Sequence, residues 1–326
     1  MVNNKTLHIY PLIFTPILKE RIWGGNNLNT YLNKNVSEND AIGESWEIST
    51  VGDDVSIVAN GYYKNFQLTQ LIDLYPKQIL GTKVYGTFRN QFPLLFKFID
   101  ASEDLSIQVH PNDEMARKYH NSFGKTEMWY IIRATNNARN IIGFSKDSSA
   151  EEYIEFLNKK QLIDILEEIY VKEKDVFFLE TGTVHAIGKG ILLAEIQQTS
   201  DITYRIYDWD RVDNQGNSRE LHLDMALESI NYKKKNTKLE YPKIANTPNN
   251  IVQSPYFSVN YLSINKEMNF NNNGDSFKVY MCVEGSYKLE YNGMEYSFEK
   301  GSTILLPAVL DVYTLKGNAE LLEIYI

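Results

Sequence analysis

The chain has 326 residues, 43% of them hydrophobic, and a net charge of -9 at pH 7. At roughly 100 to 200 residues per domain, this length allows two domains, each with a sizeable core. Because negative charge dominates and the Lys and Arg residues are scattered, we expect no nucleic acid partner. The single cysteine, Cys282, excludes an intramolecular disulfide framework and a thiolate-rich zinc site, so any metal must be held by His, Gln, Asp or Glu.

The first 25 residues do not form a continuous apolar segment of the signal-peptide type. Pro11, Pro16, Lys19 and Glu20 interrupt the apolar residues there, and no apolar run elsewhere approaches the length that spans a membrane. We therefore expect a soluble, unexported, cytoplasmic protein with no membrane partner. The sequence predicts no particular oligomeric state.

Short strand-like runs separated by turns make up most of the chain. Examples in chain order are FPLLFKFID (92–100), MWYIIR (128–133), ILLAEI (191–196), YKLEY (287–291) and STILLP (302–307). This pattern is typical of a β-sandwich or barrel. The fold class is therefore expected to be mainly β.

One predicted strand, residues 106–110, carries polar groups on a single face. Ser106, Gln108 and His110 alternate with apolar residues, and a period of two places the three polar side chains on one side of a strand. Glu127 follows shortly after in the chain. An amide, an imidazole and a carboxylate gathered in this way need a partner.

Residues 148–174 predict a small helical insert. Ser149 precedes Glu152 by three residues, which is the spacing of a capping box. The apolar residues that follow fall at helical spacing. They are Tyr153, Phe156, Leu157, Leu162, Ile163, Ile165 and Leu166.

A stretch rich in Asn, Lys, Thr and Pro near residues 235–250 predicts a domain boundary, and strand-like alternation resumes at Phe257. We expect a first domain over 1–238 and a second over 239–326. A short repeat relates the two, because DVFFLETGTVH (175–185) aligns with GSTILLPAVLD (301–311). The first copy ends in His185 and the second in Asp311, so the second barrel is expected to bind no metal.

The five histidines divide into two groups. His8 and His222 alternate with apolar residues and are interpreted as structural, while His120 lies in a polar, helix-like stretch and is expected to be exposed. His110 and His185 lie at strand ends, and with Gln108 and Glu127 they would form a nitrogen and oxygen ligand set. Such a set suits zinc and also manganese, iron or cobalt. Four protein ligands at most would leave positions open for a substrate.

Several ordered motifs carry a resemblance to a known family. They are FPLLFKFIDASEDLSIQVHPND (92–113), GKTEMWYII (124–132) and TGTVHAIGKGILLAEIQQTSDITYRIYDWDR (181–211). Together they resemble class I mannose-6-phosphate isomerase in its short bacterial form. The resemblance covers about residues 12–213 closely and residues 240–326 at the level of the fold. It implies tandem cupin-type jelly-roll barrels with a small helical insert and one zinc ion in the first barrel.

The resemblance also implies roles for single residues. Gln108, His110, Glu127 and His185 would be the zinc ligands, and Arg205 matches the active-site arginine of the family. Where longer forms have His-Lys-Pro-Glu, this chain has GKTE (124–127). Lys125 and the glutamate are kept, but the histidine proposed for ring opening is missing, so that role has no assigned residue.

Other candidates come from residues in apolar surroundings. Lys97 is either an exposed edge residue or a lysine that needs an anion, such as a sugar phosphate. Burial of Glu195 would raise its pKa toward that of a general base, and pairing with a buried lysine is the alternative. Lys125 is a candidate for stabilising oxyanion charge. Ser106, together with Lys97 and Arg205, is a candidate substrate-binding residue.

The implied reaction interconverts mannose 6-phosphate and fructose 6-phosphate through a cis-enediol or enediolate. A metal ion and one base on one face of the sugar are enough to move the proton between C1 and C2. Two alternatives stay open, namely a metal-dependent cupin oxygenase and a non-catalytic sugar-phosphate sensor. Oxygen consumption with Fe(II) would distinguish the oxygenase, and an intact ligand set with open metal positions favours an enzyme over a sensor.

Overall fold

The computed structural model describes residues 9–35, 41–212 and 215–326. His8 lies outside these described residues. The chain packs into two compact units, unit 1 with residues 1–17, 47–93 and 241–326, and unit 2 with residues 18–46 and 94–240. None of the described helices is long and apolar enough to cross a membrane.

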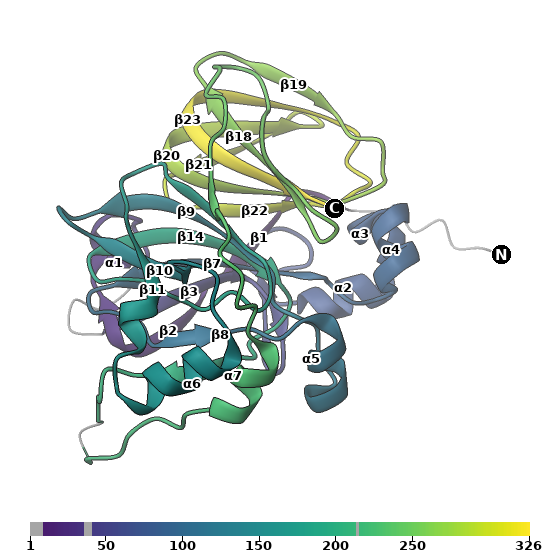
Figure 1. Cartoon of the computed structure of the whole chain (residues 1–326). Coiled ribbons are helices and arrows are strands. Elements are labelled where there is room, and N and C mark those ends of the chain that lie inside the picture. The colour runs from purple at the N-terminus through teal and green to yellow at the C-terminus, as the bar shows by residue number, and fades with distance from the viewer. Residues whose placement is uncertain (1–8, 36–40, 213–214) are drawn as a thin grey trace. The chain divides into compact units, whose positions relative to one another are not determined.

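Unit 2 contains two β-sheets (Figure 1). The strand order of the seven-stranded sheet is β16 (Lys238–Leu239), β12 (Val176–Leu179), β9 (Glu127–Ala134), β14 (Ile191–Gln198), β7 (Leu94–Ala101), β2 (Ile17–Gly25) and β3 (Ile42–Ile48). The strand order of the five-stranded sheet is β11 (Leu166–Tyr170), β10 (Arg139–Phe144), β13 (His185–Ala186), β8 (Ile107–Val109) and β15 (Tyr204–Tyr207). Side chains of both sheets, such as Trp129 and Ile142, share one buried cluster. The two sheets therefore face each other across a common core.

The outer face of the five-stranded sheet is covered by helices. Ile107 and Val109 of β8 pack there with Tyr153 of helix α6 (Ala150–Asn158) and Ala226 of helix α7 (Leu223–Ser229). The period-two pattern predicted from the sequence is thus confirmed, because the apolar residues of β8 lie outside under the helices. Gln108, between them, points to the opposite side, into the space between the sheets.

The predicted helical insert is confirmed in its first half and wrong in its second. Ser149 caps α6 by accepting a hydrogen bond from the Glu152 backbone N–H at 3.2 Å. A short 3-10 helix, η1 (Leu162–Ile165), follows, and the chain then forms strand β11. Residues 166–170 pair with β10 because that edge of the sheet offers backbone partners that a helix would leave unused. The remaining helices of unit 2 are α1 (Asn27–Thr30) and α5 (Asp113–His120).

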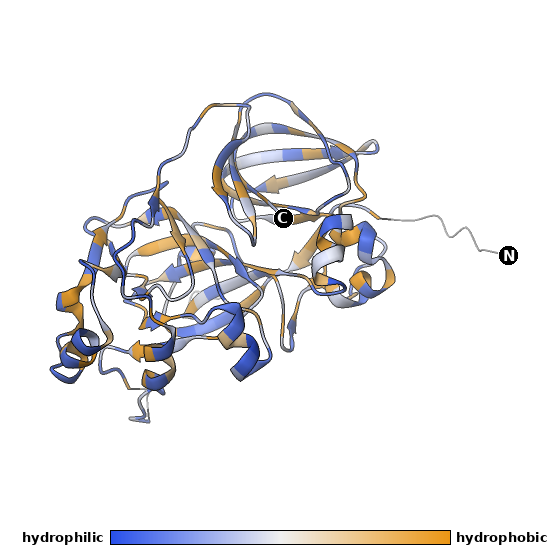
Figure 2. Cartoon of the chain, turned by 45° about the vertical axis from the view of Figure 1, so that its right-hand side comes forward, coloured by the Kyte–Doolittle hydropathy of each residue, from blue (hydrophilic) through white to orange (hydrophobic). Residues whose placement is uncertain are grey.

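Unit 1 is built on a nine-stranded sheet. Its main path is β17 (Asn249–Gln253), β18 (Ser258–Ile264), β23 (Val312–Tyr325), β20 (Lys278–Tyr291), β22 (Thr303–Leu306), β1 (Leu12–Thr15) and β6 (Ile57–Val58), with β19 (Met268–Asn271) beside β23 and β21 (Met294–Glu299) beside β20. Helices α2 (Leu68–Leu74), α3 (Pro76–Leu80) and α4 (Thr82–Phe88) and the hairpin β4 (Thr50–Val51) and β5 (Asp54–Val55) complete it. In β20, residues 279–283 are all buried, whereas buried and exposed residues alternate from Tyr287 on, and the strands of this unit carry both hydrophobic and hydrophilic residues (Figure 2).

The compact units and the domains predicted from the sequence are divided differently. Unit 2 ends at Glu240, next to the predicted boundary, but residues 9–17 and 47–93 pack with 241–326. One cause is that β1 pairs with β22 and β6, far away in the sequence. In unit 1, Asp311 follows β22 and is exposed. The expectation of a metal-free C-terminal barrel stays a prediction.

Candidate metal centre and active site

Three strands of the five-stranded sheet bring three predicted site residues into one row. In the antiparallel register, Gln108 of β8 lies opposite His185 of β13 on one side and opposite Arg205 of β15 on the other. Directly opposed residues of an antiparallel pair project to the same face, with Cβ atoms about 5 Å apart. The amide, the imidazole and the guanidinium therefore start from neighbouring positions on the inner face.

The two imidazoles present the same atom to a common point. His110 donates from Nδ1 to the Ile202 carbonyl at 2.8 Å, and His185 from Nδ1 to the Thr183 carbonyl at 2.8 Å. These bonds fix the tautomer, so that each Nε2 carries a lone pair and no hydrogen. The ring centroids lie 4.8 Å apart, and both residues are 2% exposed.

Glu127, at the start of β9 in the facing sheet, completes the group. Its Oε2 lies 3.6 Å from His110 Nε2 and its Oε1 lies 3.4 Å from His185 Nε2. Ligand atoms of these three buried residues all lie within 4.8 Å of one another. Glu127 Oε1 is buried and has no hydrogen-bond partner in the part of the chain that the structure describes. A buried carboxylate oxygen without a partner is costly, and a cation would satisfy it. The residues present therefore fit a divalent metal ion.

The surroundings keep both imidazoles neutral, as metal ligation requires. Burial and the Lys125 ammonium hold the pKa of His110 well below its usual range, and the same two causes lower the pKa of His185 to about 4. Burial raises the pKa of the Glu127 carboxyl to about 7, with Glu195 adding to the rise and Lys125 opposing it. At neutral pH the site thus has unprotonated imidazole Nε2 atoms and a carboxyl that loses its proton readily when a cation binds.

Lys125 and Gln108 border this group. Lys125 Nζ lies 2.6 Å from Glu127 Oε2 and 2.9 Å from His110 Nε2. Gln108 Nε2 lies 3.4 Å from His185 Nε2, and its Oε1 accepts a hydrogen bond from the Ser106 hydroxyl at 3.3 Å. Rotating the terminal amide by about 180° would turn the oxygen toward the imidazoles, and amide orientation is assigned from the hydrogen-bond network. Gln108 is thus within reach of the group, and Ser106 supports it.

The facing sheet holds a second row, of buried charges. Trp129 of β9, Glu195 of β14 and Lys97 of β7 lie opposite one another in register. Lys97 Nζ lies 3.1 Å from Glu195 Oε2, and Trp129 Nε1 donates to Glu195 Oε1 at 2.9 Å. Glu44 approaches Lys97 at 3.8 Å and accepts a hydrogen bond from Trp46 Nε1 at 2.6 Å.

The contacts in this row bear on the expected pKa of Glu195 and on the expected burial of Lys97. The prediction that the pKa of Glu195 rises toward that of a general base is wrong, because burial raises it but the charges of Lys97 and Lys125 outweigh burial and lower the pKa to about 2. Lys97 is buried, as its apolar strand suggested, and its anion is supplied by the protein itself. Sequence reasoning assigned no role to Glu44, whose only signal was a carboxylate within the strand-like run GESWEIS (43–49).

Comparison with known proteins identifies the family. Residues 12–160 match the family model "Phosphomannose isomerase type I, catalytic domain", and residues 247–326 match "Mannose-6-phosphate isomerase, cupin domain". Mannose-6-phosphate isomerase ManA of Bacillus subtilis (strain 168) is 37% identical over 315 residues, covering 95% of this chain and 97% of that protein. The chain belongs to the type I phosphomannose isomerase family.

Two further relatives agree. The mannose-6-phosphate isomerase of Streptococcus mutans is 32% identical over 314 residues, covering 96% of this chain and 97% of that protein. A crystal structure of the mannose 6-phosphate isomerase from Bacillus subtilis superposes with a TM-score of 0.89 at 35% identity, covering 98% of this chain and all of that chain. The predicted family and the mainly β, cupin-type fold of a phosphomannose isomerase are confirmed.

Beside the metal group of this phosphomannose isomerase lies a set of arginines that the sequence revealed only in part. The Asp208 carboxylate binds Arg211 at 2.6 Å and Arg219 at 2.7 Å. Arg205 donates from Nη1 to the Glu220 carbonyl at 2.9 Å. Arg219 was missed because it follows a polar turn and belongs to no motif.

Proposed function

We propose that this chain catalyses the interconversion of mannose 6-phosphate and fructose 6-phosphate at one zinc ion held by Gln108, His110, Glu127 and His185. The observation that carries the proposal is the convergence of two fixed Nε2 atoms and the unpartnered Glu127 Oε1 on one buried point. The relatives described above bear the name of this activity. They do not favour an oxygenase or a sensor. We also place the enzyme in the cytoplasm.

When bound, the zinc ion would supply a Lewis acid for the carbonyl and hydroxyl oxygens of the open-chain sugar. The chain's own groups would do the rest. The Lys125 ammonium, held next to the metal group by Glu127, would stabilise negative charge as it develops on these oxygens. Arg205, on the strand next to Gln108, and Ser106, which precedes β8 and bonds to Gln108, would bind and orient the substrate.

Glu195 was the predicted general base, and its environment now argues for a different role. A carboxylate with a pKa of about 2 is a weak proton acceptor near neutral pH. We therefore propose that Glu195 positions Lys97 and Trp129 behind the site.

The proposed activity is tested by chelation and reconstitution. We expect protein treated with a chelator to lose fructose 6-phosphate formation in a coupled assay, and to regain it when zinc is added. Its circular dichroism should change little, because a core of this size does not need a metal to fold. Metal content measured by mass spectrometry accompanies each step. Full activity of verified metal-free protein would refute the zinc mechanism.

Replacing Arg205 separates substrate binding from metal binding. Arg205→Ala should keep its zinc, since a guanidinium is not a ligand, but should lower kcat/KM by roughly 100-fold through loss of charged hydrogen bonds to the substrate. Steady-state kinetics and metal analysis of the same preparation check this. Loss of zinc in this variant would show that Arg205 supports the metal group instead.

A further inference from the structure

The arginines next to the metal group form a preorganised cationic site, which we call the arginine cluster and define as Arg205, Arg211 and Arg219. Two of them are anchored on Asp208, which is 5% exposed. Arg211 Nη2 donates to Asp208 Oδ1 at 2.6 Å, and Arg219 binds both carboxylate oxygens, with Nε donating to Oδ2 at 2.7 Å and Nη2 to Oδ1. A guanidinium held by two bonds to a buried carboxylate loses little further freedom when it binds an anion.

Arg205 lies against the backbone that carries Arg219. Its Nη1 donates to the Glu220 carbonyl at 2.9 Å, and its backbone carbonyl accepts from the His222 N–H at 2.8 Å. Its Nε is buried and has no hydrogen-bond partner among the described residues. Burial and the charges of Arg219 and Arg211 lower the pKa of Arg205. The three positive charges are thus close enough to repel one another, and the Nε–H of Arg205 remains available as a hydrogen-bond donor.

Among the described residues, the ion pairs of the arginine cluster go to a single carboxylate. Three guanidinium groups beside that carboxylate of Asp208 leave a formal charge of +2 in this part of the chain. The neighbouring Glu220 carboxylate points to solvent, with its side chain 83% exposed. A phosphate monoester carries a charge of about -2 at neutral pH and offers three acceptor oxygens. Its charge and donor requirement match what the cluster offers.

We propose that Arg205, Arg211 and Arg219 bind the phosphate group of the substrate, and that Asp208 is a positioning residue for two of them. This rests on the proposed function, because it assigns the phosphate of the sugar phosphate to these arginines. Two observations favour it. Arg205 is the cross-strand neighbour of Gln108, so one member of the cluster lies on the strand beside the metal group, and Lys97 is already paired with Glu195. The alternative is that the ion pairs of Asp208 with Arg211 and Arg219 only stabilise the turn after β15.

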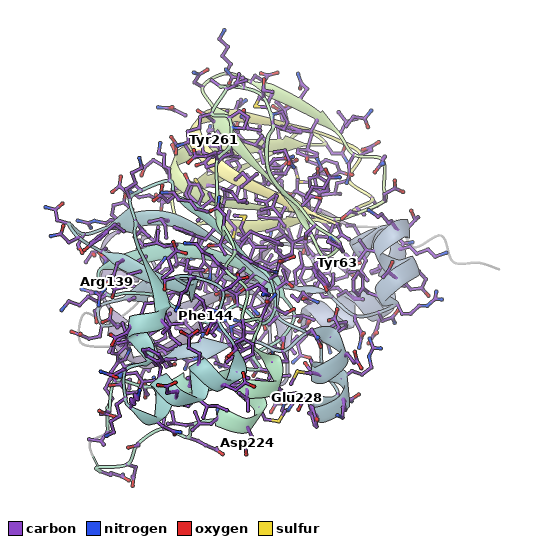
Figure 3. The ribbon with its side chains drawn as sticks, viewed as in Figure 1. Tyr63, Arg139, Phe144, Asp224, Glu228 and Tyr261 are labelled. Carbon is purple, nitrogen blue, oxygen red and sulfur yellow. The ribbon has the colours of Figure 1, made fainter. Side chains whose placement is uncertain are left out.

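The test uses Arg219→Gln in the zinc-loaded protein. We expect KM for mannose 6-phosphate to rise about 10-fold or more, with kcat reduced much less, because the lost bonds are remote from the reacting carbons. Competitive inhibition by inorganic phosphate should weaken by a similar factor. Arg219→Lys should recover part of both, since it keeps the charge but not the bidentate geometry. The matched control is Arg139→Gln, which removes a surface arginine paired with Glu168 at 2.8 Å in the same unit (Figure 3).

The outcomes separate the two interpretations. The proposal would be overturned if KM and the inhibition constant for phosphate stayed unchanged while the midpoint of thermal unfolding fell. The arginines would then only stabilise the turn after β15. Binding of inorganic phosphate is also measured by calorimetry on wild-type protein and Arg219→Gln. If the wild type has no isomerase activity, the proposed function fails. Phosphate binding that weakens in the variant would still support the cluster as a phosphate site, and binding that does not weaken would overturn it.

Discussion

We expect His110→Ala and His185→Ala to lose most of their bound metal and to fall in isomerase activity by more than about 100-fold. Each substitution removes an Nε2 that a backbone carbonyl holds in place through Nδ1, and no other described imidazole lies close enough to replace it. The remaining ligands would be one imidazole, the Glu127 carboxylate and the Gln108 amide. Such a set binds a divalent cation weakly, because zinc prefers several strong nitrogen or thiolate donors.

Gln108→Ala should have the smallest effect of the ligand substitutions, about 10-fold in metal affinity. A neutral amide oxygen is the weakest ligand of the four, and Gln108 must also turn its amide to offer that oxygen. Metal analysis by mass spectrometry, zinc titration and the coupled assay are applied to all three variants. Equal losses in Gln108→Ala and His110→Ala would show that the amide contributes more than its chemistry predicts.

His120→Ala is the matched control for these histidine substitutions. His120 is exposed at the end of the hydrophilic helix α5 and bonds to the Tyr204 hydroxyl at 2.8 Å (Figures 1 and 2). Its removal should leave the metal content unchanged. Metal retained by both His110→Ala and His185→Ala would contradict the site described above.

Glu195→Gln should lower the free energy of unfolding by about 3 to 5 kcal/mol, as measured by urea denaturation. The substitution leaves the Lys97 ammonium, whose side chain is 7% exposed, without the carboxylate at 3.1 Å. Glu44 at 3.8 Å compensates only in part, because it already accepts from Arg21 and Trp46. Glutamine has nearly the shape of glutamate and keeps an acceptor for Trp129. The loss of stability therefore measures the effect of removing the negative charge.

The pH dependence of stability gives an independent check. The folded-state pKa of Glu195, about 2, lies below its ordinary value of 4.5, so its ion pair stabilises the fold above pH 4.5 and loses this effect as the pH falls toward 2. The difference in stability between wild type and Glu195→Gln should therefore shrink over that interval. The kinetics of folded Glu195→Gln test whether Glu195 positions Lys97 and Trp129 or acts as the general base. A loss of kcat by several orders of magnitude without a loss of stability would restore Glu195 as the base.

Glu155→Gln is the control for this substitution. Glu155 forms an ion pair with Lys159 on α6, where the two side chains are 58% and 55% exposed. Removing such a surface pair should change the free energy of unfolding by less than about 0.5 kcal/mol. A change as large as that in Glu195→Gln would mean that burial is not the cause.

The sequence by itself determined the fold class, the family and the residue types of the metal group. A period of two placed Gln108 on one face of a strand, and Ile107 and Val109 on the other, because successive side chains of a strand alternate wherever the strand lies. The strand-end histidines were found in the same way. These features depend on local geometry, which neighbouring residues fix.

Only the tertiary structure decided which of these residues meet and what their charges become. The register of β13, β8 and β15 brings His185, Gln108 and Arg205 into one row, and the register of β14 and β7 places Lys97 opposite Glu195. This second pairing reverses the pKa shift that burial alone predicts for the carboxyl. Pairing with β10 makes residues 166–170 a strand where a helix was predicted, and the fold brings Arg219 onto Asp208. Pairing between distant strands depends on the whole core, and electrostatic energies depend on distances that periodicity does not contain.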